Sequence, residues 1–153
     1  MNYIGLNKYD TANGEGIRVS LFVSGCSLYC KGCFNKESWN FNAGKEFTKF
    51  VKEEIINELK KPYINGFSLL GGDPLEPKLH KDVLDLVKSI KTEMLNKDIW
   101  LWTGRLYEDE KDNEILKYID VLIDGPFIQE LADKNLQYRG SSNQRVIYVN
   151  RIN

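Results

Sequence analysis

Apolar runs of two different periods alternate along this chain, and the alternation limits the folds it can adopt. Short runs such as 17-IRVSLFV-23 and 67-FSLL-70 have the length and composition of strands. Longer stretches between them, residues 48–61 and 77–94, place apolar side chains at the helical period. Strands that alternate with helices and are apolar on both faces indicate an α/β fold with a mostly parallel sheet.

The remaining segments continue this order. A strand is expected at 99–103, a short helix at 113–119, a strand at 121–124 and a fifth strand at 145–149. The helix at 48–61 is expected to bury Phe50, Val51, Ile55 and Leu59 and to end at Pro62. With 153 residues and no repeat or low-complexity linker, the chain is expected to form one domain, residues 1–153.

Composition excludes several classes of protein. The net charge is -1, so a basic footprint for nucleic acid or an anionic membrane is missing from the sequence. The first ten residues, MNYIGLNKYD, lack the apolar centre of a signal peptide, and apolar runs stay well short of the roughly 20 residues of a membrane helix. We therefore expect a cytoplasmic protein with reduced thiols that binds neither nucleic acid nor membrane.

Polar, glycine-containing turns follow four of the expected strands. They are 24-SGC-26, 71-GGDP-74, 103-TG-104 and 124-DGP-126. The carboxyl ends of parallel strands lie at one edge of a sheet, where α/β proteins bind their ligands. The four turns are therefore expected to converge on one ligand site.

All three cysteines fall in 24-SGCSLYCKGCFN-35, with the spacing C-x3-C-x2-C. Cys26, Cys30 and Cys33 would share one face of a helix, but Gly25 and Gly32 within the segment favour a loop. A structural zinc site would need a fourth ligand, and the single histidine of the chain, His80, falls in the second expected helix. An iron–sulfur cluster held by three thiolates would leave one iron open to an outside ligand.

The cysteine spacing, followed by the aromatic Phe34, resembles the signature of the radical S-adenosylmethionine superfamily. That resemblance implies a [4Fe-4S] cluster on the three thiolates and S-adenosylmethionine chelated to the fourth iron. Further stretches resemble the anaerobic ribonucleoside-triphosphate reductase-activating proteins, in that family's order and spacing. They are 13-NGEGIRVSLFVSGC-26, 68-SLLGGDPL-75, 99-IWLWTG-104, 121-VLIDGPFI-128 and 139-RGSSNQR-145.

The resemblance also implies roles for individual residues. The cluster ligands would be Cys26, Cys30 and Cys33, which are the residues on which catalysis depends. Cofactor contacts would come from Gly32, Cys33, Phe34, Gly71, Gly72, Asp73, Thr103 and Asp124. Phe34 would pack near the adenine, and backbone around the GGDP turn would accept hydrogen bonds from the methionyl amino group. Thr103 and Asp124 would contact the ribose or the methionyl carboxylate, although Asp124 equally suits a residue that shapes the turn before Pro126.

Two positions depart from the commoner patterns. The turn reads GGDP where the superfamily often has GGEP, and Glu15 stands where the family often has proline. The polar segment 139–145 is expected near the site or the partner. Trp39, Trp100 and Trp102 are expected to pack in the core or at its edge, and His80 is expected on a helix surface.

The fold and activity that follow from the resemblance are those of a radical enzyme. A closed eight-stranded barrel needs roughly 250 residues, so the chain would form an incomplete, open βα barrel of about four or five mostly parallel strands. The substrate would be a glycine of the large anaerobic reductase, and flavodoxin or ferredoxin would supply the electron. The alternatives are an activase of another glycyl-radical enzyme, a small-molecule radical enzyme such as a deazaguanine synthase and, from another class, a zinc-binding interaction module.

Overall fold

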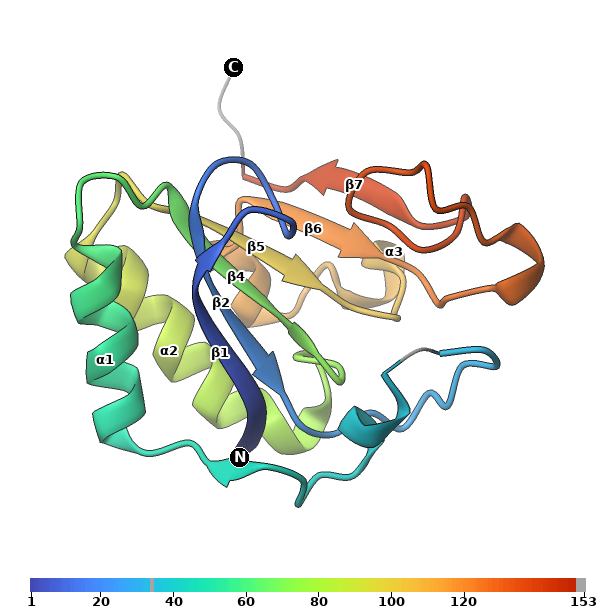
Figure 1. Ribbon diagram of the computed structural model, residues 1–153, viewed down its shortest axis with the longest axis horizontal. Helices are drawn as coiled ribbons and strands as arrows, with labels where there is room; N and C mark the ends of the chain where they lie inside the picture. The colour runs from blue at the N-terminus through green and yellow to red at the C-terminus, as the bar shows by residue number, and fades with distance from the viewer. Residues whose placement is uncertain (34, 151–153) are drawn as a thin grey trace.

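A single mixed sheet organises the chain (Figure 1). The computed structural model describes residues 1–33 and 35–150, and over these ranges the strand order is β3-β1-β2-β4-β5-β6-β7. The strands are β1 (Asn2–Asp10), β2 (Arg18–Val23), β3 (Lys45–Glu46), β4 (Gly66–Gly71), β5 (Asp98–Trp102), β6 (Val121–Asp124) and β7 (Arg145–Tyr148). The central strands β2, β4, β5 and β6 are parallel, whereas β1, β3 and β7 pair antiparallel with their neighbours. The sheet is open, with β3 and β7 at its two edges.

Helices and 3-10 helices lie in the connections between the strands. They are α1 (Lys49–Leu59), α2 (His80–Glu93) and α3 (Tyr107–Glu110), together with the 3-10 helices η1 (Lys36–Trp39), η2 (Pro77–Leu79), η3 (Glu114–Tyr118) and η4 (Gln129–Leu131). Thr48 caps α1 by accepting a hydrogen bond from the backbone N–H of Val51. The two long helices are confirmed, and the short helix expected at 113–119 is present as the 3-10 helix η3. Within the described residues, no helix is long and apolar enough to cross a membrane.

The core lies between one face of the sheet and the helices (Figure 1). Alternate residues of β2, namely Val19, Leu21 and Val23, are fully buried there, as are Ile55 and Leu59 of α1. The central strands contribute their alternate side chains to the same layer, because successive residues of a strand point to opposite faces. Burial of this continuous apolar layer is the main stabilising contribution to the fold.

The prediction that Phe50 belongs to the buried stripe of α1 is wrong. Its side chain is 74% exposed. Val51, Ile55 and Leu59 follow the i, i+4, i+8 spacing of one helix face, and Phe50 lies one residue, or about 100°, away from that face. The helical period is correct for Val51, Ile55 and Leu59, but Phe50 does not belong to the buried face of α1.

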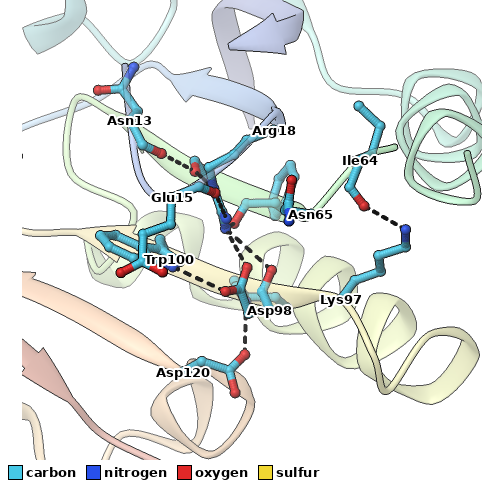
Figure 2. A network of polar contacts seen from close by, with 12 residues as sticks. Asn13, Glu15, Arg18, Ile64, Asn65, Lys97, Asp98, Trp100 and Asp120 are labelled. Atoms are coloured by element: carbon cyan, nitrogen blue, oxygen red, sulfur yellow. Dashed lines mark hydrogen bonds and ion pairs between the residues drawn. The ribbon is translucent and has the colours of Figure 1, made fainter. Parts of the chain in front are cut away.

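The opposite face of the sheet carries a buried polar network around Arg18 (Figure 2). The Arg18 guanidinium donates to Ser68 Oγ at 2.6 Å and to the Glu15 carbonyl at 2.9 Å, and it pairs with Asp98 Oδ1 at 2.8 Å. It also lies over the Trp100 ring at 5.4 Å. These contacts fix the 11–17 loop, which crosses this face of the sheet before β2 begins (Figure 1).

A buried acid, Asp10, holds the start of the same loop. Asp10 accepts hydrogen bonds from Ser20 Oγ, from the Asn13 side chain and from the Ala12 backbone. Burial opposes ionisation, but these hydrogen bonds outweigh it and hold the pKa of the Asp10 carboxyl below its ordinary value. Gly14, with a φ of +113°, has its α-carbon against Arg18, where a Cβ would lie 2.8 Å from that side chain.

The expected strand count was too low. The mostly parallel α/β sheet and the strand at 145–149 are confirmed, but β1 and β3 add an antiparallel edge that the sequence patterns did not indicate. Pairing of β1 with β2 is interrupted by register shifts, so its side chains do not follow a clean alternation.

Candidate active site

The four polar turns meet at one cavity, as their positions after parallel strands predicted. The cavity has a volume of about 470 Å³ and lies at the carboxyl ends of β2, β4, β5 and β6. Its walls include the three cysteines, the Gly71–Gly72–Asp73 turn, Thr103 and Gly125. A site of this size takes a small-molecule ligand.

The cysteine loop, residues 24–39, forms one wall of the cavity. Its two ends are joined by backbone hydrogen bonds from Gly25 N to Ser38 O at 2.7 Å and from Cys26 N to Trp39 O at 3.2 Å. Between them, Cys33 N bonds to Cys30 O, and Tyr29 packs edge-on against Trp39 at 4.9 Å. The expectation of a loop in place of a helix is confirmed by this geometry.

The three thiols are free and half-buried, and all of them line the cavity. Among the residues that the structure describes, no three cysteine, histidine or acidic side chains are close enough together to form a finished metal site. Burial raises the pKa of the Cys26 thiol, and the charges of Asp73 and Glu76 add to the rise. A metal cation would reverse this preference, because it binds the thiolate and displaces the proton.

The donor set fits an iron–sulfur cluster better than zinc. Three soft sulfur ligands border one cavity, and thiolates are the usual ligands of such clusters. His80 lies at the start of α2 and is half-buried, away from the residues that line the cavity, so it does not complete a zinc site with the thiols. Phe34, expected beside the cofactor, lies outside the described residues.

The GGDP turn packs directly against the cysteine loop. Gly72 N donates to Val23 O and Asp73 N donates to Gly25 O, both at 2.8 Å. A Cβ on Gly72 would lie 2.4 Å from the Gly25 carbonyl oxygen, and Gly71 has a φ of +118°. Glycine is therefore required here for contact between two turns, whatever ligand the turn binds.

Asp73 is buried although it lies in a turn, and its side chain is 1% exposed. Its carboxylate accepts from Thr103 Oγ1 at 2.8 Å, from Gly104 N at 3.0 Å and from Arg105 Nη1 at 3.0 Å. Burial raises the pKa of the Asp73 carboxyl, while the hydrogen bonds from Leu75 and Thr103 and the charge of Arg105 oppose that rise. This carboxylate joins the turns after β4 and β5, and its role as a ligand contact stays a prediction.

Thr103 and Asp124 occupy different positions relative to the cavity. Thr103 lines the cavity, and its hydroxyl donates a hydrogen bond to the Asp73 carboxylate. Asp124 is fully buried and is bonded to the Tyr107 backbone N–H at 2.8 Å and to Arg145 Nε at 3.0 Å. The structure gives the Asp124 carboxylate this bridging role, and the neighbouring Gly125 lines the cavity in its place. Gly32 lies in the cysteine loop and has a φ of +79°, but it does not line the cavity.

The 139–145 segment closes the far side of the cavity. The Gln144 side chain accepts from Gly140 N and donates to Gly125 O, each within 3.0 Å, so it ties this segment to the turn after β6. Asn143 donates to Pro126 O across the same junction. Arg139 and Gln144 both line the cavity, which agrees with the expectation that this segment lies near the site.

Sequence reasoning missed Glu76 and Arg105. Glu76, 4% exposed, accepts hydrogen bonds at 2.6 Å from both the backbone N–H and the hydroxyl of Ser27, next to Cys26. Arg105 lies between Asp73 and Glu76, and despite its burial these two carboxylates raise its pKa. No local pattern could have paired these residues, because about 30 residues of chain separate Arg105 from its partners.

Comparison with known proteins agrees with the geometry. The family described as a 4Fe-4S single cluster domain matches residues 12–147. A protein of Haemophilus influenzae is 51% identical over 94% of this chain and 96% of its own length, and its name is anaerobic ribonucleoside-triphosphate reductase-activating protein. Proteins with the same name from bacteriophage T4 and Escherichia coli K12 are 47% and 46% identical, each over more than nine-tenths of both chains.

The chain belongs to the family of anaerobic ribonucleoside-triphosphate reductase-activating proteins. The matched family is defined by one [4Fe-4S] cluster, which agrees with three thiols on one cavity wall. This removes the zinc-binding module from consideration.

Proposed function

We propose that this chain is the activase of an anaerobic ribonucleoside-triphosphate reductase and installs a glycyl radical on it. One observation carries the proposal: the three free thiols line the same cavity as the Gly71–Gly72–Asp73 turn in a chain of this family. We further propose that the open sheet is a partial barrel of the radical S-adenosylmethionine type, with its ligands at the carboxyl ends of the strands.

In this proposal the cavity holds two cofactors. Cys26, Cys30 and Cys33 would hold the [4Fe-4S] cluster, and the GGDP turn would bind S-adenosylmethionine beside it. When bound, the reduced cluster and S-adenosylmethionine supply a 5′-deoxyadenosyl radical, which takes a hydrogen atom from the α-carbon of a glycine in the reductase. The cofactors provide the reactive chemistry, and the protein provides binding, orientation and shielding from water.

The side chains of the cavity support this division of roles. Backbone carbonyls of the GGDP turn are the right acceptors for the ammonium group of a methionyl moiety. Because the Asp73 carboxylate is already bonded to Thr103, Gly104 and Arg105, it acts on this ligand by holding the turn in place. Thr103 keeps its proposed contact to the ribose or the methionyl carboxylate, whereas Asp124, which does not line the cavity, is proposed to act on the ligand only by holding the Gly125 turn.

Trp102, Phe127 and Tyr138 give the far wall an apolar, aromatic surface. Trp102 Nε1 donates to the Tyr138 carbonyl at 2.7 Å, so the two residues form one unit. Such a wall excludes water from a reactive radical and offers a face against which a ligand ring or a peptide can pack. The glycine loop of the reductase would enter on this side and complete the site.

The electron donor is proposed to be flavodoxin or ferredoxin, because the cluster requires a low-potential one-electron reductant. We propose that the protein acts in the cytoplasm, where thiols stay reduced. Docking of the reductase is proposed to use the 124-DGPF-127 turn and the 139-RGSSNQR-145 segment, which are joined through Gln144 and Asn143 at the mouth of the cavity.

Anaerobic reconstitution tests this function. The protein is loaded with iron and sulfide, reduced with dithionite and mixed with S-adenosylmethionine. We expect a paramagnetic signal that changes when S-adenosylmethionine is added, followed by release of methionine and 5′-deoxyadenosine. A reduced cluster whose signal is unchanged by S-adenosylmethionine, with no cleavage product, would contradict the proposal.

A further inference from the structure

Behind the cavity, one arginine links two buried carboxylates to the cysteine loop. Arg105 Nη1 lies 3.0 Å from Asp73 Oδ2, and its Nη2 lies 3.4 Å from Glu76 Oε2. The other oxygen of Glu76, Oε1, accepts hydrogen bonds from the backbone N–H and from the hydroxyl of Ser27, both at 2.6 Å. The chain Asp73–Arg105–Glu76–Ser27 therefore ends one residue beyond Cys26.

Arg105 joins the remaining turns through its backbone. Its carbonyl accepts from Gly125 N at 2.9 Å, and its N–H donates to Thr103 Oγ1 at 3.1 Å. The turns after β2, β4, β5 and β6 are thus connected to one another through Arg105 and its two carboxylate partners. A shift of any one turn would strain the contacts of the others.

The cysteine loop depends on such contacts. Its residues Ser27, Leu28 and Tyr29 are exposed, so apolar burial does little to order the segment that joins Cys26 to Cys30. Backbone hydrogen bonds fix the start and the end of the loop, at Cys26 and Trp39. The two bonds to Glu76 hold the chain immediately after Cys26, at Ser27.

The polarity of this network points away from a purely structural role. Two carboxylates share a single guanidinium, and burying such a set stabilises a fold little compared with apolar side chains of similar volume. Its geometric effect is specific, because the charged Glu76 carboxylate accepts two hydrogen bonds from Ser27, the residue next to Cys26. Outer groups of this kind orient the ligands in metal sites generally.

We propose that Glu76, held by Arg105, is a positioning residue for the iron–sulfur cluster: it fixes the cysteine loop at Ser27 so that Cys26 faces the cavity before the cluster binds. The inference rests on cluster binding by the three cysteines. Glu76 and Arg105 would thereby help to retain the cluster, and neither would take part in the cleavage of S-adenosylmethionine.

The test measures how fast a chelator removes iron from reconstituted, anaerobic protein, without any turnover. Glu76→Ala removes the acceptor for both Ser27 donors, and we expect cluster loss to become about 10- to 100-fold faster. Glu76→Gln keeps an oxygen for Ser27 and is expected to be much closer to the parent. Ser27→Ala removes only the hydrogen bond from the hydroxyl, and we expect a smaller increase in the rate of cluster loss. This variant leaves the buried Glu76 carboxylate in place, so its effect does not come from a cavity at that position.

Two controls separate this role from general stability and from the cluster assignment. Leu59→Ala, in the buried face of α1, is expected to lower the unfolding temperature and leave the chelation rate of the folded protein unchanged. Parent-like chelation in Glu76→Ala, or equal acceleration in Glu76→Ala and Leu59→Ala, would overturn the proposal. Cys26→Ala should hold no complete cluster. If it held one at the parent's level, the cluster assignment itself would fail, and this inference with it.

Discussion

Replacement of Arg18 by methionine is the sharpest test of what holds the loop at residues 11–17 in place. Methionine keeps an unbranched apolar chain but removes the donors to Ser68, Glu15 and Phe67 and the ion pair with Asp98. Breaking one side of a buried pair costs about 3–5 kcal/mol, and the partial exposure of Asp98 favours the lower half of that range. For a chain of this size, such a loss corresponds to a fall of roughly 10 °C in the unfolding temperature.

Thermal unfolding followed by circular dichroism, together with hydrogen exchange, measures both consequences. We expect the 11–17 amides to lose protection before the core strands do, because the guanidinium bonds directly to this loop. Lys8→Met is the control, since Lys8 and Glu54 form an exposed pair worth about 0–1 kcal/mol. Equal unfolding temperatures for Arg18→Met and Lys8→Met would refute the account of Arg18 as a buried anchor.

Three further changes test separate parts of the structure. Asp10→Asn should flatten the acid side of the profile of stability against pH. The pKa of the Asp10 carboxyl is lower in the folded protein than its ordinary value of 3.8, so the ionised carboxylate stabilises the fold above pH 3.8. That stabilisation is lost as the pH falls through the lower pKa of the folded state. Denaturant titrations from pH 6 to pH 2.5 would show this, and identical slopes in mutant and parent would exclude it. Gly72→Ala should impair S-adenosylmethionine binding by displacing the GGDP turn from Gly25, an effect visible by calorimetry on reconstituted protein; unchanged affinity would mean that the turn tolerates a Cβ. Gln144→Ala should loosen the segment at the cavity mouth and reduce glycyl radical yield more than uncoupled S-adenosylmethionine cleavage. A parallel fall of both activities would place Gln144 in the cofactor site.

The parallel centre of the fold was predictable because each of its strands is a short apolar run in sequence. Residues 17–23, 67–70, 99–103 and 121–124 correspond to β2, β4, β5 and β6, with ends that differ by at most one residue. Strand β1 was not predictable in the same way. Its sequence, NYIGLNKYD, has no residue buried before Asp10, and it pairs at the antiparallel side of the sheet with an irregular register. Periodicity reports burial, and a half-exposed strand gives little periodic signal.

The position of the site was also predictable, whereas the polar contacts that build it were not. Turns after parallel strands share an edge, so the meeting of the cysteines with the GGDP turn followed from strand order alone. Turn residues are usually exposed, but Asp73 is buried, because Thr103, Gly104 and Arg105 from the turn after β5 donate hydrogen bonds to its carboxylate. Such pairings depend on the three-dimensional arrangement of distant segments, which local patterns do not report.

Transfer of a labelled hydrogen atom tests the central claim most directly. The partner reductase is prepared with glycine deuterated at the α-carbon and incubated anaerobically with the reduced, cluster-loaded protein and S-adenosylmethionine. If the protein is the activase, 5′-deoxyadenosine acquires deuterium and the reductase shows a glycyl radical by paramagnetic resonance. Cleavage of S-adenosylmethionine without deuterium in the product and without a glycyl radical would contradict the assignment.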